Sequence, residues 1–253
     1  MRKMSMSMVL LSAEFGQDRV ADPESDFEVS LNDTSDGCII TKYTGPGSDV
    51  VIPAEIQGLP VREIGAQAFS GCKSLTSVAI QEGVTRIGWE AFHGCSSLAS
   101  VAIPDSITAI GEGVFAWCGS LSSVTIPDSV TLIGKEAFSD CSSLASVTIP
   151  EGVTKIDERV FSGCKSLASV IISDGVTRIG WEAFYACSNL ASVTIPDSVT
   201  EIDADAFRYC SSLVKVNITP TKRKWSKDSF YQCVKLSLAS QAALKRAGYT
   251  GGF

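Results

Sequence analysis

Hydrophobic residues recur along this chain with one fixed step. Phenylalanine occupies every 23rd position from Phe69 to Phe230, and cysteine and leucine keep the same step from Cys72 and Leu75 onward. Self-similarity at a period of this size is the signature of a repeat architecture, in which each unit is one supersecondary element. Because three registers run without a slip, the sequence predicts a solenoid of stacked 23-residue coils.

Within one coil, the first apolar residues predict a strand. Val147 and Ile149 are two residues apart, so their side chains lie on one face of an extended segment. Pro150 follows and ends the strand, because proline has no N–H to donate to a sheet. Stacked coils would pair these strands in parallel, and each coil would then bury the apolar side that it cannot cover alone.

The second half of a coil predicts turns. Val153 and Ile156 are three residues apart, which suits a turn or a short 3₁₀ segment, and residues 160–164 carry Val, Phe and Cys at the spacing of a helical turn. The pattern predicts an α/β-type right-handed coil with a parallel β-sheet on one face and short helical or 3₁₀ turns on the other. The phenylalanines are expected to form the core, because burying each is worth about 1.5–3 kcal/mol.

Both ends of the array depart from the repeat and predict caps. Residues 27–31 alternate apolar and polar side chains, turn-forming residues follow, and 38–43 predicts a second strand, so a β-hairpin is expected. Near the C-terminus, 240–247 predicts a short helix that ends at Gly248. The expected organisation is an N-terminal leader or extension over 1–26, a hairpin cap over 27–49, the repeat array over 50–236 and a helical cap over 237–253.

The first residues leave two interpretations open. Arg2 and Lys3 precede an apolar stretch over 4–13, an order typical of a secretory signal. Serines interrupt the stretch, however, and no clear small-x-small cleavage site follows it.

The repeat unit carries a family resemblance. The pattern Leu-x-x-Val-x-Ile-Pro-x-x-Val-x-x-Ile-x-x-x-Ala-Phe-x-x-Cys resembles the BspA-like, or Treponema-type, leucine-rich repeat over residues 50–236. The resemblance implies a leucine-rich-repeat solenoid in a bacterial, often surface-exposed protein, whose relatives are associated with binding host matrix proteins and with cell–cell adhesion. It implies no particular binding residues. Where ordinary leucine-rich repeats carry asparagine, this chain has Gly83, Ser106, Ser129, Gly152, Gly175 and Ser198.

Composition and charge narrow the function further. The chain has 45% hydrophobic and 19% charged residues, which excludes a disordered protein. The net charge of −7 disfavours a nucleic-acid partner, and the one basic cluster, 221–225, is expected to be a solvated turn. No apolar run approaches the roughly 18–20 residues of a membrane span, so none is expected.

Nine cysteines and one histidine are the candidates for chemistry. Equivalent residues of stacked coils hold their Cβ vectors parallel, which does not suit a disulfide, and no Cys-x-x-Cys pair offers zinc-site spacing. We therefore expect a ladder of free, buried cysteines, with Cys38 in the hairpin as the exception whose redox state stays open. His93 is expected at an exposed, variable position on the turn side. No enzyme, cofactor or metal is predicted.

The outward side of the predicted sheet is the candidate binding surface. Its side chains are small and mostly hydroxylic, with carboxylates in register along one edge, and they would form a concave platform for a protein or a glycan. The alternative is that they only solvate the sheet. Ala102, Ile171, Lys215 and Asn217 belong to the same face. The candidate binding residues are Ser100, Ser123, Thr125, Ser146, Thr148, Ser169, Ser192, Thr194, Asp128, Glu151 and Asp174.

The large aromatic residues outside the core fall near the turns instead. Their expected state is partial burial between coils, and an exposed contact patch is the alternative. These residues are Trp89, Trp117, Trp181, Tyr185 and Tyr209.

Two functions from different classes follow. The first is a non-enzymatic binding or adhesion module, at the bacterial surface or secreted, whose ligand is a host matrix or cell-surface protein. The second is an intracellular scaffold in the cytoplasm, which the unpaired cysteines and the interrupted signal favour. The oligomeric state is left open.

Overall fold

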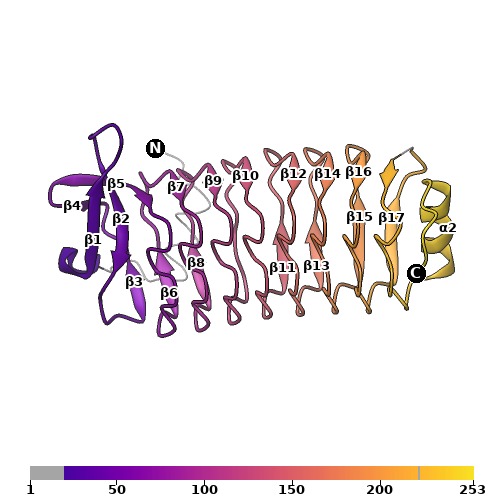
Figure 1. The fold of residues 1–253 in the computed structure, drawn as a ribbon, viewed down its shortest axis with the longest axis horizontal. Helices are drawn as coiled ribbons and strands as arrows, with labels where there is room; N and C mark the ends of the chain where they lie inside the picture. The colour runs from indigo at the N-terminus through magenta and orange to yellow at the C-terminus, as the bar shows by residue number, and fades with distance from the viewer. Residues whose placement is uncertain (1–19, 222) are drawn as a thin grey trace, which may run out of the picture.

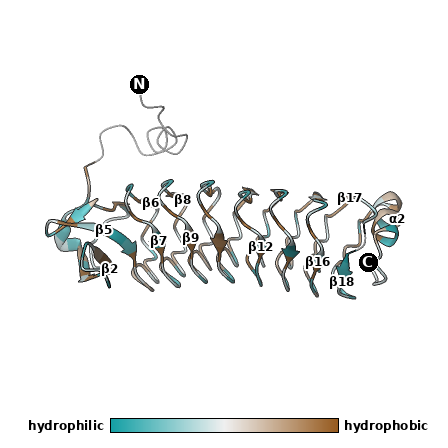
Figure 2. Cartoon of the chain, turned by 90° about the horizontal axis from the view of Figure 1, so that it is seen from above, coloured by the Kyte–Doolittle hydropathy of each residue, from teal (hydrophilic) through white to brown (hydrophobic). Residues whose placement is uncertain are grey.

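Each 23-residue unit closes one coil of a solenoid, and the coils lie side by side along a single axis (Figure 1). The structure is a computed structural model that describes residues 20–221 and 223–253. The stretch 1–19, with the candidate signal, and Lys222 of the basic cluster lie outside the described residues. Seen from above, the coils follow one another without a break (Figure 2). The predicted leucine-rich-repeat solenoid is confirmed, with about 8 turns.

The N-terminal end is covered by an antiparallel hairpin. After the short 3₁₀ helix η1 (Glu24–Asp26), strand β1 (Phe27–Leu31) pairs with β2 (Cys38–Tyr43). The side chain of Asn32 closes the turn between them, because its Oδ1 accepts the backbone N–H groups of Asp36 and Gly37 at 3.1 and 3.2 Å.

The hairpin joins the array through a second, smaller hairpin. Strand β4 (Glu55–Ile56) pairs with β5 (Leu59–Ile64), and β5 lies parallel to β2. Gln57 and Gly58 both have positive φ, 56° and 74°, as a two-residue hairpin turn of the I′ type requires.

The predicted sheet is a row of short parallel strands, here called the first strand row. Partners are one repeat apart, as in Val147 with Val170. The row falls into three hydrogen-bonded groups, and residues 121–127 between two of them form no strand. Its strands are β3 (Asp49–Val51), β6 (Ser77–Ala79), β8 (Ser100–Ala102), β11 (Ser146–Thr148), β13 (Ser169–Ile171), β15 (Ser192–Ile195) and β17 (Lys215–Ile218).

A second row of parallel strands lies where the sequence predicts only a turn. Val153 N–H does close a turn onto the Pro150 carbonyl at 3.1 Å, but Lys155 and Ile156 then pair with the next coil. A strand of two residues is too short to show alternation in the sequence. It forms because the neighbouring coils supply its hydrogen-bond partners. The second strand row contains β5 and β7 (Arg86–Ile87), β9 (Ala109–Ile110), β10 (Leu132–Ile133), β12 (Lys155–Ile156), β14 (Arg178–Ile179), β16 (Glu201–Ile202) and β18 (Lys224–Trp225).

The remaining side of each coil is a pair of tight turns, here called the turn face. Backbone bonds of the 3₁₀ type hold it, such as Ser139 N–H to Glu136 O at 3.0 Å. Bonds to the next coil alternate with them, such as Phe138 N–H to Val160 O at 2.9 Å. Among the described residues of the array, none of these turns extends into a helix.

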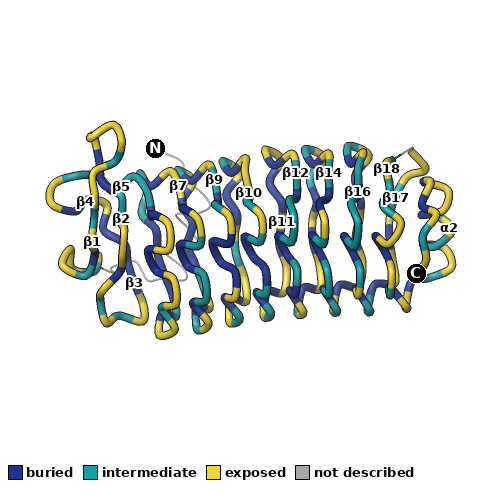
Figure 3. The backbone as a smooth tube through the Cα atoms, in the orientation of Figure 1, coloured by how far each residue is buried: buried dark blue, intermediate teal, exposed yellow. Residues whose placement is uncertain are grey.

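The phenylalanines form the core, as predicted. All of those from Phe69 to Phe230 are fully buried, and rings of successive coils are stacked with centroids 4.8–5.5 Å apart. Buried positions recur in every coil, and the coil tips are exposed or half-buried (Figure 3).

The cysteine ladder runs beside the phenylalanines and links successive coils through hydrogen bonds. The thiol of Cys141 donates to the backbone carbonyl of Phe115 in the preceding coil at 3.1 Å, so each bond joins two coils. The same bond is made by Cys95, Cys118, Cys164, Cys187, Cys210 and Cys233.

A helix closes the C-terminal end. Helix α2 (Leu238–Arg246) starts two residues before the expected position, after Ser237, whose hydroxyl accepts Ser240 N–H at 3.2 Å. Ser240 Oγ in turn accepts the backbone N–H of Val216 in β17, so the helix covers the open edge of the first strand row. Tyr249 is buried against Trp225 beneath it.

Candidate binding surfaces

The structure places the predicted binding residues on one side of the first strand row. Ser146 lies beside Ser169 and Thr148 beside Ile171, and Thr194 lies beside Asn217. From residue 123 to 217, the outward side chains of the row are exposed. Ser100 is half-buried, and the edge residues Asp128, Glu151 and Asp174 are exposed. We call the outward side from 123 to 217 the strand face.

The first coils depart from the exposed platform that the sequence predicts. Ala102 was expected to face solvent, and this is wrong: it is 9% exposed and clusters with Val51 and Ala79. Asp22 contributes to this burial, because its carboxylate accepts the backbone N–H of Val51 at 2.6 Å and its own backbone N–H donates to the Val51 carbonyl at 2.9 Å. This segment precedes the repeats, so the repeat pattern gives no sign of it.

The C-terminal end of the strand face holds a groove of about 460 Å³. Thr194 and Asn217 line it from the strands, and their side chains are hydrogen-bonded to each other at 3.0 Å. Ala243 of helix α2 forms part of its wall. The groove could not be foreseen from the repeats, because one wall comes from the cap.

The basic cluster beside this groove is only in part the solvated turn that the sequence predicts, because Lys224 is exposed and Arg223 is not. The Arg223 side chain is fully buried, and its guanidinium donates to the carbonyls of Val199 at 2.9 Å, Thr219 at 2.8 Å and Pro196 at 3.2 Å. Burial lowers the pKa of Arg223, and Asp197 at 3.5 Å opposes this shift. Arg223 thus serves the fold, because its buried guanidinium supplies hydrogen-bond donors to backbone carbonyls of two neighbouring turns.

The cysteines are all free, and Cys38 is not the exception. Its side chain is fully buried and its thiol points at the carbonyl of Leu59, whereas Cys72 at the start of the ladder is only half-buried. Burial raises the pKa of every ladder thiol, to about 12 for Cys95 and Cys233. Thiols that stay protonated are poor nucleophiles and poor metal ligands. Within the described residues, no cluster of metal-ligating side chains occurs.

The aromatic residues of the turn face are more exposed than predicted. Trp117 is 60% and Trp89 47% exposed, so burial between coils is wrong for both. Trp181 and Tyr209 are also exposed, and Tyr185 and His93 are half-buried. These side chains project from tight turns, which hold them away from the phenylalanine core.

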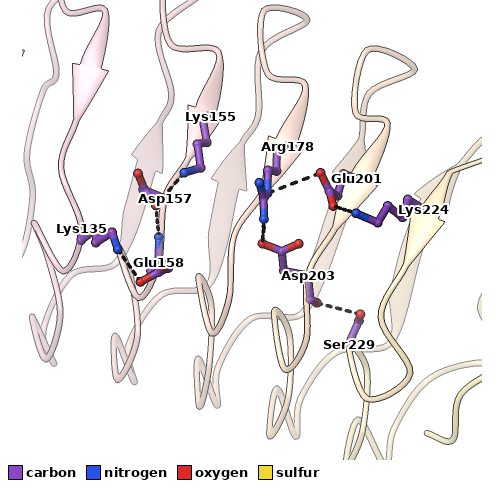
Figure 4. Close-up of polar contacts among 9 residues, drawn as sticks. All are labelled: Lys135, Lys155, Asp157, Glu158, Arg178, Glu201, Asp203, Lys224 and Ser229. Atoms are coloured by element: carbon purple, nitrogen blue, oxygen red, sulfur yellow. Dashed lines mark hydrogen bonds and ion pairs between the residues drawn. The ribbon is translucent and has the colours of Figure 1, made fainter.

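A ladder of charged side chains joins neighbouring coils beside the second strand row (Figure 4). Lys135 contacts Glu158 at 2.8 Å, Arg178 contacts Asp203 at 2.7 Å, and Lys224 contacts Glu201 at 2.5 Å. Exposed pairs of this kind contribute about 0–1 kcal/mol each to the free energy of folding, so they add little to the stability of the stacked coils. No described helix is long and apolar enough to cross a membrane.

Comparison with known proteins assigns this architecture. The model of the BspA type leucine rich repeat region matches residues 49–120 and 108–237, in six copies. The chain belongs to this family. A leucine-rich-repeat protein of Treponema pallidum, whose crystal structure is known, is 34% identical, with a TM-score of 0.71. The match covers 92% of this chain and 99% of that protein.

Weaker matches reach other bacterial repeat proteins. A leucine rich cell surface protein from Faecalibacterium prausnitzii is 22% identical, with 94% of this chain and 100% of that one covered and a TM-score of 0.35. The pneumococcal vaccine antigen PcpA is 18% identical, with 81% and 49% covered and a TM-score of 0.45. No curated protein matches the chain.

Proposed function

We propose that this protein is a non-enzymatic binding module that holds a protein ligand on the strand face, at the bacterial surface or secreted. The observation that carries the proposal is that each strand buries its inward side chains and exposes its outward ones. Inward residues such as Val147 and Val170 are buried in the core, and the outward residues between them are exposed and play no part in it.

The chemistry of the strand face suits contact with another protein. Its hydroxyl groups can donate and accept, and small side chains lose little conformational entropy when a partner covers them. Thr148 and Thr194 belong to the strands on either side of a single large apolar residue, Ile171, which is 62% exposed. Interfaces draw most of their free energy from a few well-packed side chains near the centre, and we assign this role to Ile171 as the large exposed side chain of β13.

The test compares the strand face with a matched site elsewhere. Ile171→Glu removes the apolar anchor, and Leu132→Glu makes the same change at a comparably exposed residue of the second strand row. Binding of the full chain to immobilised fibronectin and fibrinogen is measured by surface plasmon resonance. We expect saturable binding that Ile171→Glu weakens about tenfold or more, a loss of at least 1.4 kcal/mol, while Leu132→Glu leaves it unchanged.

Two results would overturn the proposal. One is the absence of saturable binding to either matrix protein at micromolar concentration. The other is equal weakening by both substitutions, which would place the contact away from the strand face.

The free cysteines support an intracellular scaffold as the second candidate. Free cysteines usually indicate a reducing compartment. Here burial weakens that indication, because the ladder thiols with their raised pKa values resist oxidation both in the cytoplasm and outside the cell. Fractionation of the native cells, with protease treatment of intact cells, separates the two: removal of the protein by external protease supports the surface, and full protection supports the cytoplasm.

A further inference from the structure

The turn face repeats one unusual backbone conformation in every coil. Its second left-handed position is glycine in several coils, as at Gly94 (φ 69°) and Gly163 (φ 73°). Glycine adopts this conformation without cost, whereas a side chain with a Cβ is strained there. The same position carries Trp117 (φ 63°) and Tyr209 (φ 60°).

Asp140, Ala186 and Gln232 carry positive φ at this position too, so several coils bear some strain here, and Trp117 is the bulkiest residue among them. A bulky aromatic residue with positive φ is a genuine conformational outlier. Its side chain is 60% exposed, so core packing does not compensate for the strain. Strained and exposed residues of this kind gather at functional sites, which makes Trp117 a candidate contact residue.

A trough begins at this tryptophan. A cavity of about 360 Å³ lies on the turn face, with Trp117 on the first of its coils and Tyr185 three coils further on. Between them the lining residues on this side are small, Ser139, Ser162 and Gly163, which keep the trough open. The steps between these coils measure 5.4, 5.5 and 5.5 Å on the phenylalanine ladder.

Polar groups along the trough are held in fixed positions. Arg159 lies between two carboxylates, with its Nη1 3.5 Å from Glu136 and its Nε 2.6 Å from Glu182. Its guanidinium also lies 4.5 Å from the centre of the Trp181 ring. These contacts orient both acceptors and donors before any ligand arrives, which lowers the entropic cost of binding.

The charge of the lining excludes one class of ligand. Glu136, Asp140 and Glu182 face only Arg159 and Lys165, in a chain with a net charge of −7. A polyanionic ligand would be repelled, so the ligand carries no net negative charge.

The geometry points to a neutral oligosaccharide as the occupant of this trough. The apolar C–H faces of pyranose rings stack on Trp117 and Tyr185, and the sugar hydroxyls bond to the carboxylates, to Arg159 and to the serines. One coil step is close to the advance of one sugar residue in an extended chain, so three steps hold a tri- or tetrasaccharide. A peptide fits less well, because the floor of serine and glycine offers no apolar pocket for its side chains.

The strain at Trp117 gives the test two readouts that move in opposite directions. Trp117→Gly removes the stacking surface and also the backbone strain, so it should weaken saccharide binding about tenfold or more and raise the melting temperature. The matched control is Gln232→Gly, at the same turn position with the same φ of 63° but outside the trough. It should raise the melting temperature and leave the affinity unchanged.

Binding to the full chain is measured by titration calorimetry with cellotetraose, chitotetraose and maltotetraose, and with a heparin tetrasaccharide as the polyanionic probe. Saturable binding of a neutral probe that Trp117→Gly weakens and Gln232→Gly does not is the expected result. Ile171→Glu leaves this affinity unchanged, which separates the trough from the strand face. The proposal is overturned if no neutral probe binds at millimolar concentration, or if only the heparin tetrasaccharide binds. It is also overturned if Trp117→Gly leaves the affinity for sugar unchanged, or if the trough binds a phage-displayed peptide instead of a sugar and that binding requires Trp117.

Discussion

Phe138→Ala tests the core at the middle of the array. Phe138 is fully buried between Phe115 and Phe161, with ring centroids 5.4 and 5.5 Å away and interplanar angles of 19° and 7°. Truncating a buried phenylalanine costs about 3–5 kcal/mol through lost transfer free energy and the cavity that remains. Two stacked partners lose contact at once, each pair being worth about 0.5–1.5 kcal/mol, so we expect the upper half of that range.

Urea unfolding followed by far-ultraviolet circular dichroism measures the loss. Coils contact only their neighbours, so a weak central coil should also divide the array and lower the dependence of unfolding free energy on urea. The control is Leu132→Ala, because Leu132 is 54% exposed and its truncation should change stability by less than about 0.5 kcal/mol. A loss below about 1 kcal/mol for Phe138→Ala would mean that the phenylalanine ladder is not the core.

Two further predictions concern buried polar groups. Burial raises the pKa of the ladder thiols above that of a free thiol, to about 12 for Cys95, so they stay protonated in the folded chain while unfolded thiols ionise. Stability should therefore be fully present below pH 9 and fall between pH 9 and 12, by up to about 1.4 kcal/mol per pH unit for each thiol; a urea midpoint that does not fall between pH 8.5 and 10 would contradict this. Arg223→Lys should cost about 1.5–3 kcal/mol, because lysine cannot reach all the carbonyls that the buried guanidinium bonds, while Lys224→Ala, at an exposed pair, should cost less than about 1 kcal/mol; equal losses in thermal unfolding would refute the structural part assigned to Arg223.

The sequence predicts what the repeat enforces in every coil. Phe138 and Cys141 recur at a fixed step, so their stacking follows from periodicity alone, and the hairpin and helical caps follow from local turn and capping residues. The second strand row is less visible. The pair Lys155–Ile156 is too short to alternate, and it becomes a strand only through bonds to neighbouring coils.

Residues that break the repeat are the ones that could not be predicted. Ala102 is buried together with Val51 and next to a segment that precedes the array, and the Arg223 side chain is buried where backbone carbonyls from two successive coils converge on it. The exposure of Trp117 depends on a left-handed backbone conformation that recurs in every coil, at glycine in some coils and at other residues in the rest. Each of these features rests on contacts between residues that no local pattern brings together.

Core residues and contact residues lie on opposite sides of the first strand row, and hydrogen–deuterium exchange of the full chain with and without bound matrix protein tests this separation. The account predicts that the ligand slows exchange in β11, β13 and β15, the strands that carry the exposed hydroxyls and Ile171, and leaves the second strand row unchanged. Protection confined to the second strand row or to the turn face, with none in these three strands, would contradict it.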